Sequence, residues 1–179
     1  MRAVAPRVLR RDPNSRYKSG LMKPISSEIL IDAPPRVVFD VVLDLDRYPD
    51  WNPFTPRVGL RTEDVAPGAE FELVCRMTET ELLEHEHEVV LALDRDRMSF
   101  CMGTSRTRGR PGIRSARWQR CRLASGGRTR FVNSEGFRGP LAPLVTLLYR
   151  KKLARAFDRY GKALKARAEA VAARGVATT

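Results

Sequence analysis

The chain has 179 residues, 42% of them apolar, and a net charge of +12, so it has enough apolar material for the core of one domain. No window approaches about 18 consecutive apolar residues, which excludes a membrane-spanning helix, and no apolar signal-peptide core follows Met1. The three cysteines, Cys75, Cys101 and Cys121, lack metal-ligand spacing and are typical of reduced core residues. We therefore expect a cytoplasmic protein without a cofactor.

The first 24 residues form a basic segment. They contain seven Lys or Arg residues and one Asp, and they show no sustained apolar period, which predicts disorder. An organelle presequence is the alternative, although Pro6 and Pro13 would interrupt its amphipathic helix. We expect a disordered tail over residues 1–24, one folded domain over residues 25–174 and a short C-terminal tail over residues 175–179.

A strand, a helix and an aromatic turn follow one another in the segment SSEILIDAPPRVVFDVVLDLDRYPDWNPF, residues 26–54. Two prolines stand where a helix start tolerates a missing N–H, and apolar residues then recur at helical spacing until Pro49, which should end the helix. Tyr48, Trp51 and Phe54 crowd the exit loop. Their rings would either plug one end of the core or form the rim of a cavity.

This segment resembles the opening of the helix-grip proteins grouped as START, Bet v 1 and polyketide cyclase-like (SRPBCC). The matching residues are Ile29 and Ile31 in the strand, Ala33-Pro34-Pro35 at the helix entry, Val37, Val38, Phe39 and Val42 on its apolar face, and Tyr48-Pro49-Asp50-Trp51-Asn52-Pro53-Phe54 at its exit. The resemblance covers roughly residues 26–172. It implies a seven-stranded antiparallel sheet curved around a long C-terminal helix, with short helices after the first strand and a ligand cavity between sheet and helix. It does not identify the ligand, because this superfold carries several activities.

Alternating runs after the aromatic turn predict the remaining strands. They lie near residues 54–63, 69–79, 84–95, 97–104, 113–124 and 128–138, which together with residues 26–32 makes seven strands. Consecutive strands with helices kept apart from them indicate an α+β fold with an antiparallel sheet.

One long helix is expected from about Pro140 to Arg174. Its apolar stripe should pack on the sheet and consists of Tyr149, Leu153, Phe157, Tyr160, Leu164, Ala168 and Val171. The first turns are apolar nearly all round, with Leu141, Leu144, Val145, Leu147 and Leu148. These turns would either be covered on several sides or line an opening beneath a mobile lid.

Period-two alternation predicts which strand residues face the cavity. Placing Gln119 and Cys121 inward puts Trp118 outward, unless a bulge intervenes. The expected ligand-binding residues, from the strands, the exit loop and the long helix, are Trp51, Phe54, Phe71, Leu73, Cys75, Met77, His85, His87, Val89, Leu91, Phe100, Met102, Gln119, Cys121, Phe131, Asn133, Glu135, Phe137, Leu144 and Leu148.

Five polar side chains fall in this set: His85, His87, Gln119, Asn133 and Glu135. Apolar walls with a few convergent polar groups are typical of small-molecule sites. A buried carboxylate is costly unless it is paired, hydrogen-bonded or protonated, so Glu135 and the neighbouring His87 are our candidate catalytic acid or base. Alternatively, the strand ends reach solvent and these side chains are hydrated. We expect no metal, because a histidine and carboxylate site would need a coincidence across the sheet.

The charge is unevenly distributed along the chain. Residues 97–138 contain eleven basic residues and one acidic residue, whereas residues 25–96 contain six basic and 17 acidic residues. A basic surface suits an anionic partner, such as an acidic carrier protein or an anionic membrane. The alternative is that these arginines simply fill the solvent-facing positions of the strands.

We interpret the chain as a protein that binds a hydrophobic small molecule of polyketide, lipid or aromatic type. Whether it is an enzyme is left open; as a cyclase or dehydratase it would hold a reactive chain while His87 or Glu135 moves a proton. The alternative is a non-catalytic lipid or quinone carrier that docks on anionic membrane. A ribosome- or RNA-associated factor is a more remote alternative, because no stacking aromatics alternate with the arginines, and we do not expect nucleic acid as a partner. The sequence leaves the oligomeric state open.

Overall fold

The computed structural model describes residues 23–176, so most of the expected N-terminal tail and the last three residues lie outside the described part of the chain. The strands are β1 (Ile25–Ile31), β2 (Arg57–Val58), β3 (Glu70–Arg76), β4 (Leu82–Asp94), β5 (Ser99–Thr104), β6 (Arg114–Leu123) and β7 (Thr129–Arg138). The helices are α1 (Pro35–Leu43), α2 (Tyr48–Trp51) and α3 (Ala142–Val176), with the short 3-10 turns η2 (Leu45–Arg47), η3 (Thr62–Asp64) and η4 (Ser125–Gly127). The predicted α+β fold is confirmed.

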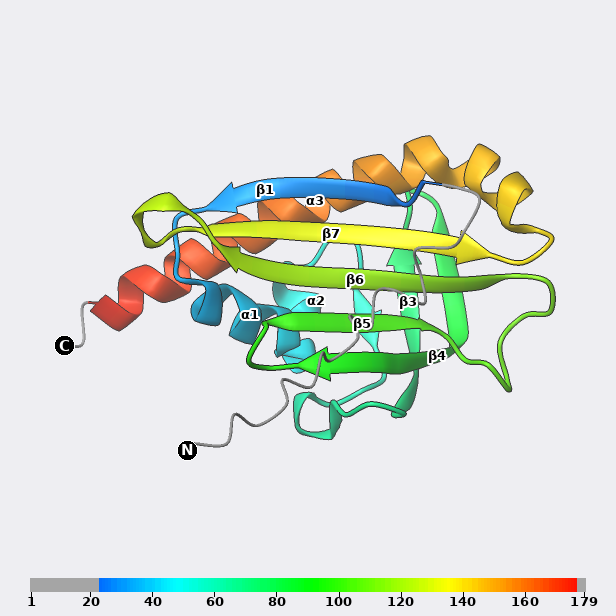
Figure 1. Ribbon diagram of the computed structural model, residues 1–179, viewed down its shortest axis with the longest axis horizontal. Helices are drawn as coiled ribbons and strands as arrows, with labels where there is room; N and C mark the ends of the chain where they lie inside the picture. The colour runs from blue at the N-terminus through cyan, green and yellow to red at the C-terminus, as the bar shows by residue number, and fades with distance from the viewer. Residues whose placement is uncertain (1–22, 177–179) are drawn as a thin grey trace, which may run out of the picture.

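The strands form one antiparallel seven-stranded sheet in the order β1-β7-β6-β5-β4-β3-β2. Figure 1 shows the sheet curving around α3, with α1 and α2 on the same side of the sheet as α3. We call this side the inner face and the opposite side the outer face. The helix-grip arrangement implied by residues 26–54 is therefore present.

The segment after β1 differs from the expected single helix. α1 ends at Leu43, and the next residue, Asp44, leaves the helical region with φ −77° and ψ 71°. Pro49 lies in the first turn of α2. Because the first turn of a helix tolerates the missing N–H of proline, Pro49 begins the second helix and does not end the first.

The main core lies between the inner face and α3. Five residues of the predicted α3 stripe are buried in one cluster with the strand residues, Leu153, Phe157, Tyr160, Leu164 and Ala168, whereas Tyr149 and Val171 are partly buried and pack against it. Gly161 lies against β1, where a Cβ would make an ordinary contact with the Ile29 side chain at 3.5 Å. The buried α3 stripe therefore fixes which strand residues face the helix.

Two irregularities in β4 overturn part of the predicted alternation. Against β3, Phe71 pairs with Glu88 and Leu73 pairs with His85, so β4 has one extra residue between them. Against β5, Val90 pairs with Met102 and the next pair is Ala92 with Cys101, so Leu91 is a second extra residue. Such bulges change the face on which the following side chains lie.

Because of these bulges, three residues that were predicted to face inward do not do so. Val90, not Val89, joins the main core, and Leu91 packs on the outer-face cluster. His87 falls in the first bulge beside Glu86, opposite the outward Glu72, so the register places it on the outer face. The assignment of His87, Val89 and Leu91 to the inner face is wrong.

A smaller cluster covers the outer face. It contains Cys101, Ala116 and Trp118, with Leu91 and Ala92 packed against it. The β6–β7 register runs without a shift from Arg114 to Leu123, so Trp118 faces outward as the simple alternation predicts. A bulge at Trp118 is not needed.

Two glycines on the outer face allow a matched test of how tightly β5 packs against β6. Gly103 and Gly136 flank Ala116 in one cross-strand row. A Cβ at Gly103 would lie 2.2 Å from the Ser115 carbonyl oxygen, whereas a Cβ at Gly136 would meet nothing within 4 Å. We expect Gly103→Ala to lower the free energy of unfolding by roughly 1–3 kcal/mol, and Gly136→Ala to change it by less than about 1 kcal/mol. Urea unfolding of both variants measures this, and equal losses would contradict the packing described here.

Candidate functional site

Arg117 lies at the centre of the inner face, between Met102 of β5 and Glu135 of β7. Arg117 is buried, with only 5% of its surface exposed. The guanidinium carbon lies 4.6, 5.1 and 4.9 Å from the ring centroids of Phe54, Phe157 and Tyr160. Aromatic faces attract a cation, and this attraction is stronger where water is excluded. The three rings therefore form a cage that holds the buried positive charge.

Amide side chains adjoin this cage. Arg117 Nε donates a hydrogen bond to Asn133 Oδ1 at 3.0 Å, and the Tyr160 hydroxyl donates to Gln119 Oε1. Gln119 and Asn133 are direct cross-strand partners on β6 and β7. The Trp51 ring stacks on Tyr160 with its centroid 5.8 Å away.

Three donors in this group have unused hydrogen-bonding capacity. Gln119 Nε2, Asn133 Nδ2 and Trp51 Nε1 are buried and have no hydrogen-bond partner in the described part of the chain. Buried donors are nearly always paired in native proteins, because leaving one unpaired costs free energy. All three adjoin the aromatic cage, because Asn133 accepts from Arg117, Gln119 accepts from Tyr160 and Trp51 stacks on Tyr160.

Two tyrosines at this site remain protonated. Burial raises the pKa of Tyr48 to about 12, and burial likewise raises the pKa of Tyr160 well above its ordinary value. The Tyr48 hydroxyl donates to the Val42 carbonyl at 2.7 Å. Both phenols therefore act as neutral donors and not as bases.

Glu135 is the carboxylate of the site. Burial raises its pKa to about 6, which outweighs the lowering by the Arg117 charge and by a hydrogen bond from Ser115. The nearby Glu88 carboxylate raises the pKa further. Glu135 therefore exchanges a proton near neutral pH, which is the range that suits a general acid or base.

A second charged pair lies beyond Glu135. His85 Nδ1 lies 3.5 Å from Glu88 Oε1, and the side chain of Glu88 is buried. Burial lowers the pKa of His85, but hydrogen bonds with Cys75 and Glu88 raise it by more, so the net shift is upward. His85 therefore carries a positive charge at neutral pH, and it compensates the charge of Glu88.

The structure brings most of the predicted site residues to the inner face. Phe54, Phe71, Leu73, Cys75, Met77, Phe100, Met102, Cys121 and Phe131 belong to the main core, Trp51 and Phe137 pack against it, and Gln119 and Asn133 are fully buried. His85 and Glu135 reach the same face through their register partners. Leu144 and Leu148 do not, because both are exposed on the first turns of α3. Their predicted place in the cavity lining is therefore corrected.

Sequence reasoning missed Arg117 and Glu88. Arg117 stands two residues before Gln119, so the alternation that placed Gln119 inward also places Arg117 inward. It was overlooked because arginine in an arginine-rich run is usually solvent-exposed. Glu88 had no comparable signal, since it reaches the inner face only through the first bulge of β4.

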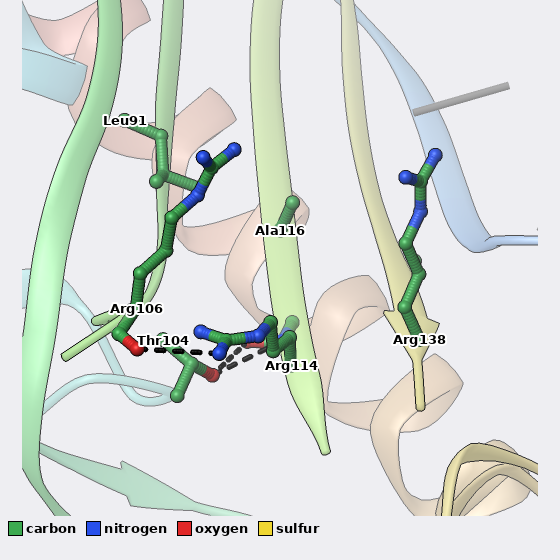
Figure 2. A pocket seen from close by; sticks show the side chains of 8 residues that line it. Leu91, Thr104, Arg106, Arg114, Ala116 and Arg138 are labelled. Atoms are coloured by element: carbon green, nitrogen blue, oxygen red, sulfur yellow. Dashed lines mark hydrogen bonds between the residues drawn. The ribbon is translucent and has the colours of Figure 1, made fainter. Parts of the chain in front are cut away.

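The outer face carries a separate hollow near the start of β6 (Figure 2). Its volume is about 370 Å³, and Arg106, Arg114 and Arg138 line it together with Leu91, Thr104, Ser115, Ala116 and Gly136. Arg114 donates to the carbonyl oxygens of Ser105 and Arg106 at 3.4 and 3.2 Å. Both acceptors are neutral, so these bonds position the guanidinium without cancelling its charge.

The described residues offer neither a metal centre nor a membrane span. Between residues 23 and 176, no group of three or more His, Cys, Asp or Glu side chains is arranged to hold a metal ion. No helix in that range is long and apolar enough to cross a bilayer. The three cysteines are buried free thiols.

A sheet wrapped around a C-terminal helix, with a polar centre on the inner face, defines this chain as a helix-grip protein. The sequence belongs to the family described as polyketide cyclase / dehydrase and lipid transport, whose model matches residues 22–169. This family fold suggests that the chain binds a hydrophobic ligand. A comparison with curated proteins gave no significant match.

Solved structures with this fold show low sequence identity to the chain. The Zhui aromatase/cyclase of Streptomyces sp. R1128 is 19% identical with a TM-score of 0.60, and the match covers 86% of this chain and 95% of that one. TTHA0849 of Thermus thermophilus is 17% identical with a TM-score of 0.61, over 83% and 99% of the two chains. The hypothetical protein jhp0584 of Helicobacter pylori is 12% identical with a TM-score of 0.67, over 93% and 99%. At these identities the likeness shows the fold alone.

The raised pKa of Glu135 predicts a pH dependence of stability. The carboxyl has a pKa of about 6 when folded and an ordinary value of 4.5, so the folded protein holds this proton more tightly than the unfolded chain. Between about pH 4.5 and pH 6 the Glu135 contribution should therefore fall with rising pH, by about 2 kcal/mol in total. Urea unfolding of wild type and Glu135→Gln across this range should show the variant gaining relative stability as pH rises. The opposite sign would mean that Arg117 stabilises the ionised carboxylate more than burial disfavours it.

Proposed function

We propose that the chain binds a hydrophobic small molecule on the inner face of the sheet, through the oxygens of a carbonyl, enolate or carboxylate group. The observation that carries this proposal is the buried guanidinium of Arg117 beside three unpartnered donors. The aromatic and aliphatic residues around them offer an apolar surface to the rest of the molecule.

The chemistry of the donors narrows the ligand class. Gln119, Asn133 and Trp51 each present an unpartnered N–H group, and a purely hydrocarbon ligand would leave all three unpaired. An oxygenated aromatic or polyketide-like molecule would satisfy them, and its rings would stack on Trp51 and Tyr160. We therefore favour such a ligand over a simple aliphatic lipid.

Glu135 supports the second part of the proposal, which is that the protein is also a catalyst. It is a register partner of Arg117, and its pKa of about 6 lets it accept or return a proton near neutral pH. With Arg117 stabilising the oxyanion of an enolate, Glu135 would remove a proton from carbon in a cyclisation, or deliver one to a leaving hydroxyl in a dehydration. His87, the other expected acid or base, lies on the outer face and has no part in this step.

Ligand recognition can be tested with Trp51 as the reporter. The chain has two tryptophans, so Trp118→Phe leaves Trp51 alone. Titration with a hydroxyanthraquinone carboxylate should quench its fluorescence, and Arg117→Gln should raise Kd at least about tenfold, since hydrogen bonds to charged groups contribute roughly 1.5–3 kcal/mol. Gln119→Glu keeps the oxygen that accepts from Tyr160 but removes the unpartnered donor, and it should also weaken binding.

The controls separate recognition from folding. Arg122→Gln removes an exposed arginine of the same strand and should leave Kd unchanged. Anthracene, which has no oxygen, should bind wild type and Arg117→Gln alike. Loss of carboxylate binding in a variant that unfolds at the wild-type urea concentration supports the proposal, whereas equal affinity of wild type, Arg117→Gln and Gln119→Glu would refute it.

The catalytic step has its own test. If Glu135 transfers a proton, Glu135→Gln should slow cyclisation or dehydration of a poly-β-ketone thioester by roughly 10²-fold or more, while Kd for the anthraquinone probe stays within a few fold. Single-turnover product analysis measures the rate, and Glu86→Gln, which changes an exposed carboxylate of β4, serves as the control. Binding of the probe by a wild type that does not turn the thioester over would indicate a carrier instead.

A further inference from the structure

The first turns of α3 expose a cluster of leucines. Seven large hydrophobic residues are exposed among the described residues, and four of them, Leu141, Leu144, Leu147 and Leu148, lie within about two turns at the start of this helix. Leu147 is the most exposed of them, at 79%. A fifth exposed leucine, Leu82, is the first residue of β4. It lies near the same turns of α3, because its neighbour Glu81 pairs with Lys152, one turn after Leu148. Contiguous exposed apolar residues mark an interaction site more often than scattered single ones do.

Arginines surround this leucine cluster. The loop between β5 and β6 packs against the start of α3, because Leu141 N donates to the Gly112 carbonyl at 3.0 Å. That loop and its flanks bring Arg106, Arg110 and Arg114 to the same end of the molecule, and Arg138 ends β7 just before α3. Figure 1 shows the start of α3, the end of β7 and the start of β6 together at this end. The hollow lined by Arg106, Arg114 and Arg138 opens beside it (Figure 2).

Acidic residues are scarce in the sequence that builds this end. Between Arg97 and Phe157 the only Asp or Glu is Glu135, which lies on the inner face. Two nearby carboxylates from other strands are engaged, Glu70 with Arg108 and Glu81 with Lys152, and Glu79 is an exposed carboxylate in the turn before β4. Farther along α3, Arg150 and Lys151 lie two and three residues after Leu148 and are exposed. The apolar cluster therefore has a positive rim.

We propose that this end of the molecule docks on an anionic lipid membrane. The four leucines at the start of α3 insert among the acyl chains near the headgroups, and the arginines of the rim contact the lipid phosphates, with the outer-face hollow taking a headgroup. Interfacial binding of this kind depends jointly on buried apolar area and on attraction to anionic lipid.

The charge pattern favours a membrane over a protein partner or a second copy of the chain. A self-complementary contact across this end would bring two positive rims together, and like charges facing each other across an interface are destabilising. An anionic bilayer matches both the sign of the rim and the apolar centre. The proposal is independent of the ligand bound on the inner face.

The test is cosedimentation of the full-length protein with vesicles at physiological salt. Binding to phosphatidylcholine mixed with phosphatidylglycerol should exceed binding to phosphatidylcholine alone. The double variant Leu147→Ser/Leu148→Ser should lower binding to the mixed vesicles about tenfold or more, because it removes apolar area that binding buries. Leu123→Ser is the control, since Leu123 is 72% exposed at the opposite end of β6 and should leave binding unchanged.

The arginines have an equally matched control. Arg114 and Arg138 are cross-strand partners at the docking end of β6 and β7, and Arg122 and Arg130 are partners at the other end of the same strands. Each double Arg→Gln variant removes two charges, but only Arg114→Gln/Arg138→Gln should weaken vesicle binding severalfold and flatten its salt dependence.

Equal losses in the two arginine variants, or in the leucine variant and Leu123→Ser, would overturn the proposal. So would binding that ignores anionic lipid. A wild-type dimer in analytical ultracentrifugation that Leu147→Ser/Leu148→Ser converts to monomer would assign this end to self-association instead.

Discussion

The inner face of the sheet is organised by a buried positive charge. Moving a guanidinium out of water costs several kcal/mol unless other groups replace its hydration. Arg117 finds that replacement in the rings of Phe54, Phe157 and Tyr160 and in the amide of Asn133. These groups come from the exit loop of α2, from α3 and from β7, so the burial of one side chain requires three separate parts of the chain to be in place.

The inner face was largely predictable, because period-two alternation is reliable wherever strands pair without irregularity. β6 and β7 pair without a shift, and the predicted inward positions Gln119, Cys121, Asn133 and Glu135 all follow from that register. The helix-grip architecture was predictable for a different reason: a short strand, a double-proline helix entry and an aromatic exit form a distinctive local order.

The wrong predictions of which residues face inward fall where the residue types give no sign of the local backbone geometry. β4 reads as clean alternation of His and Glu, yet two bulges place Glu88 and Val90 inward and His87 and Leu91 outward. No glycine or proline within β4 marks either bulge, so the residue types do not reveal where the alternation breaks. Arg117 is a different case. The alternation along β6 correctly places it inward, but we did not count it as a site residue because arginine is usually exposed.

The proposed ligand site and the proposed docking end are connected through the same two strands. Along β6 and β7, the pair Arg117 and Glu135 stands three residues from the pair Arg114 and Arg138. At about 3.4 Å per residue this is roughly 10 Å of strand. Because an odd number of residues separates the two pairs, Arg114 and Arg138 lie on the outer face while Arg117 and Glu135 lie on the inner face, so a lipid headgroup and the proposed ligand would bind on opposite sides of the sheet. Because an ion pair is less screened away from water, Arg117 would hold an anionic oxygen group more firmly than the water-exposed arginines at the start of β6 would.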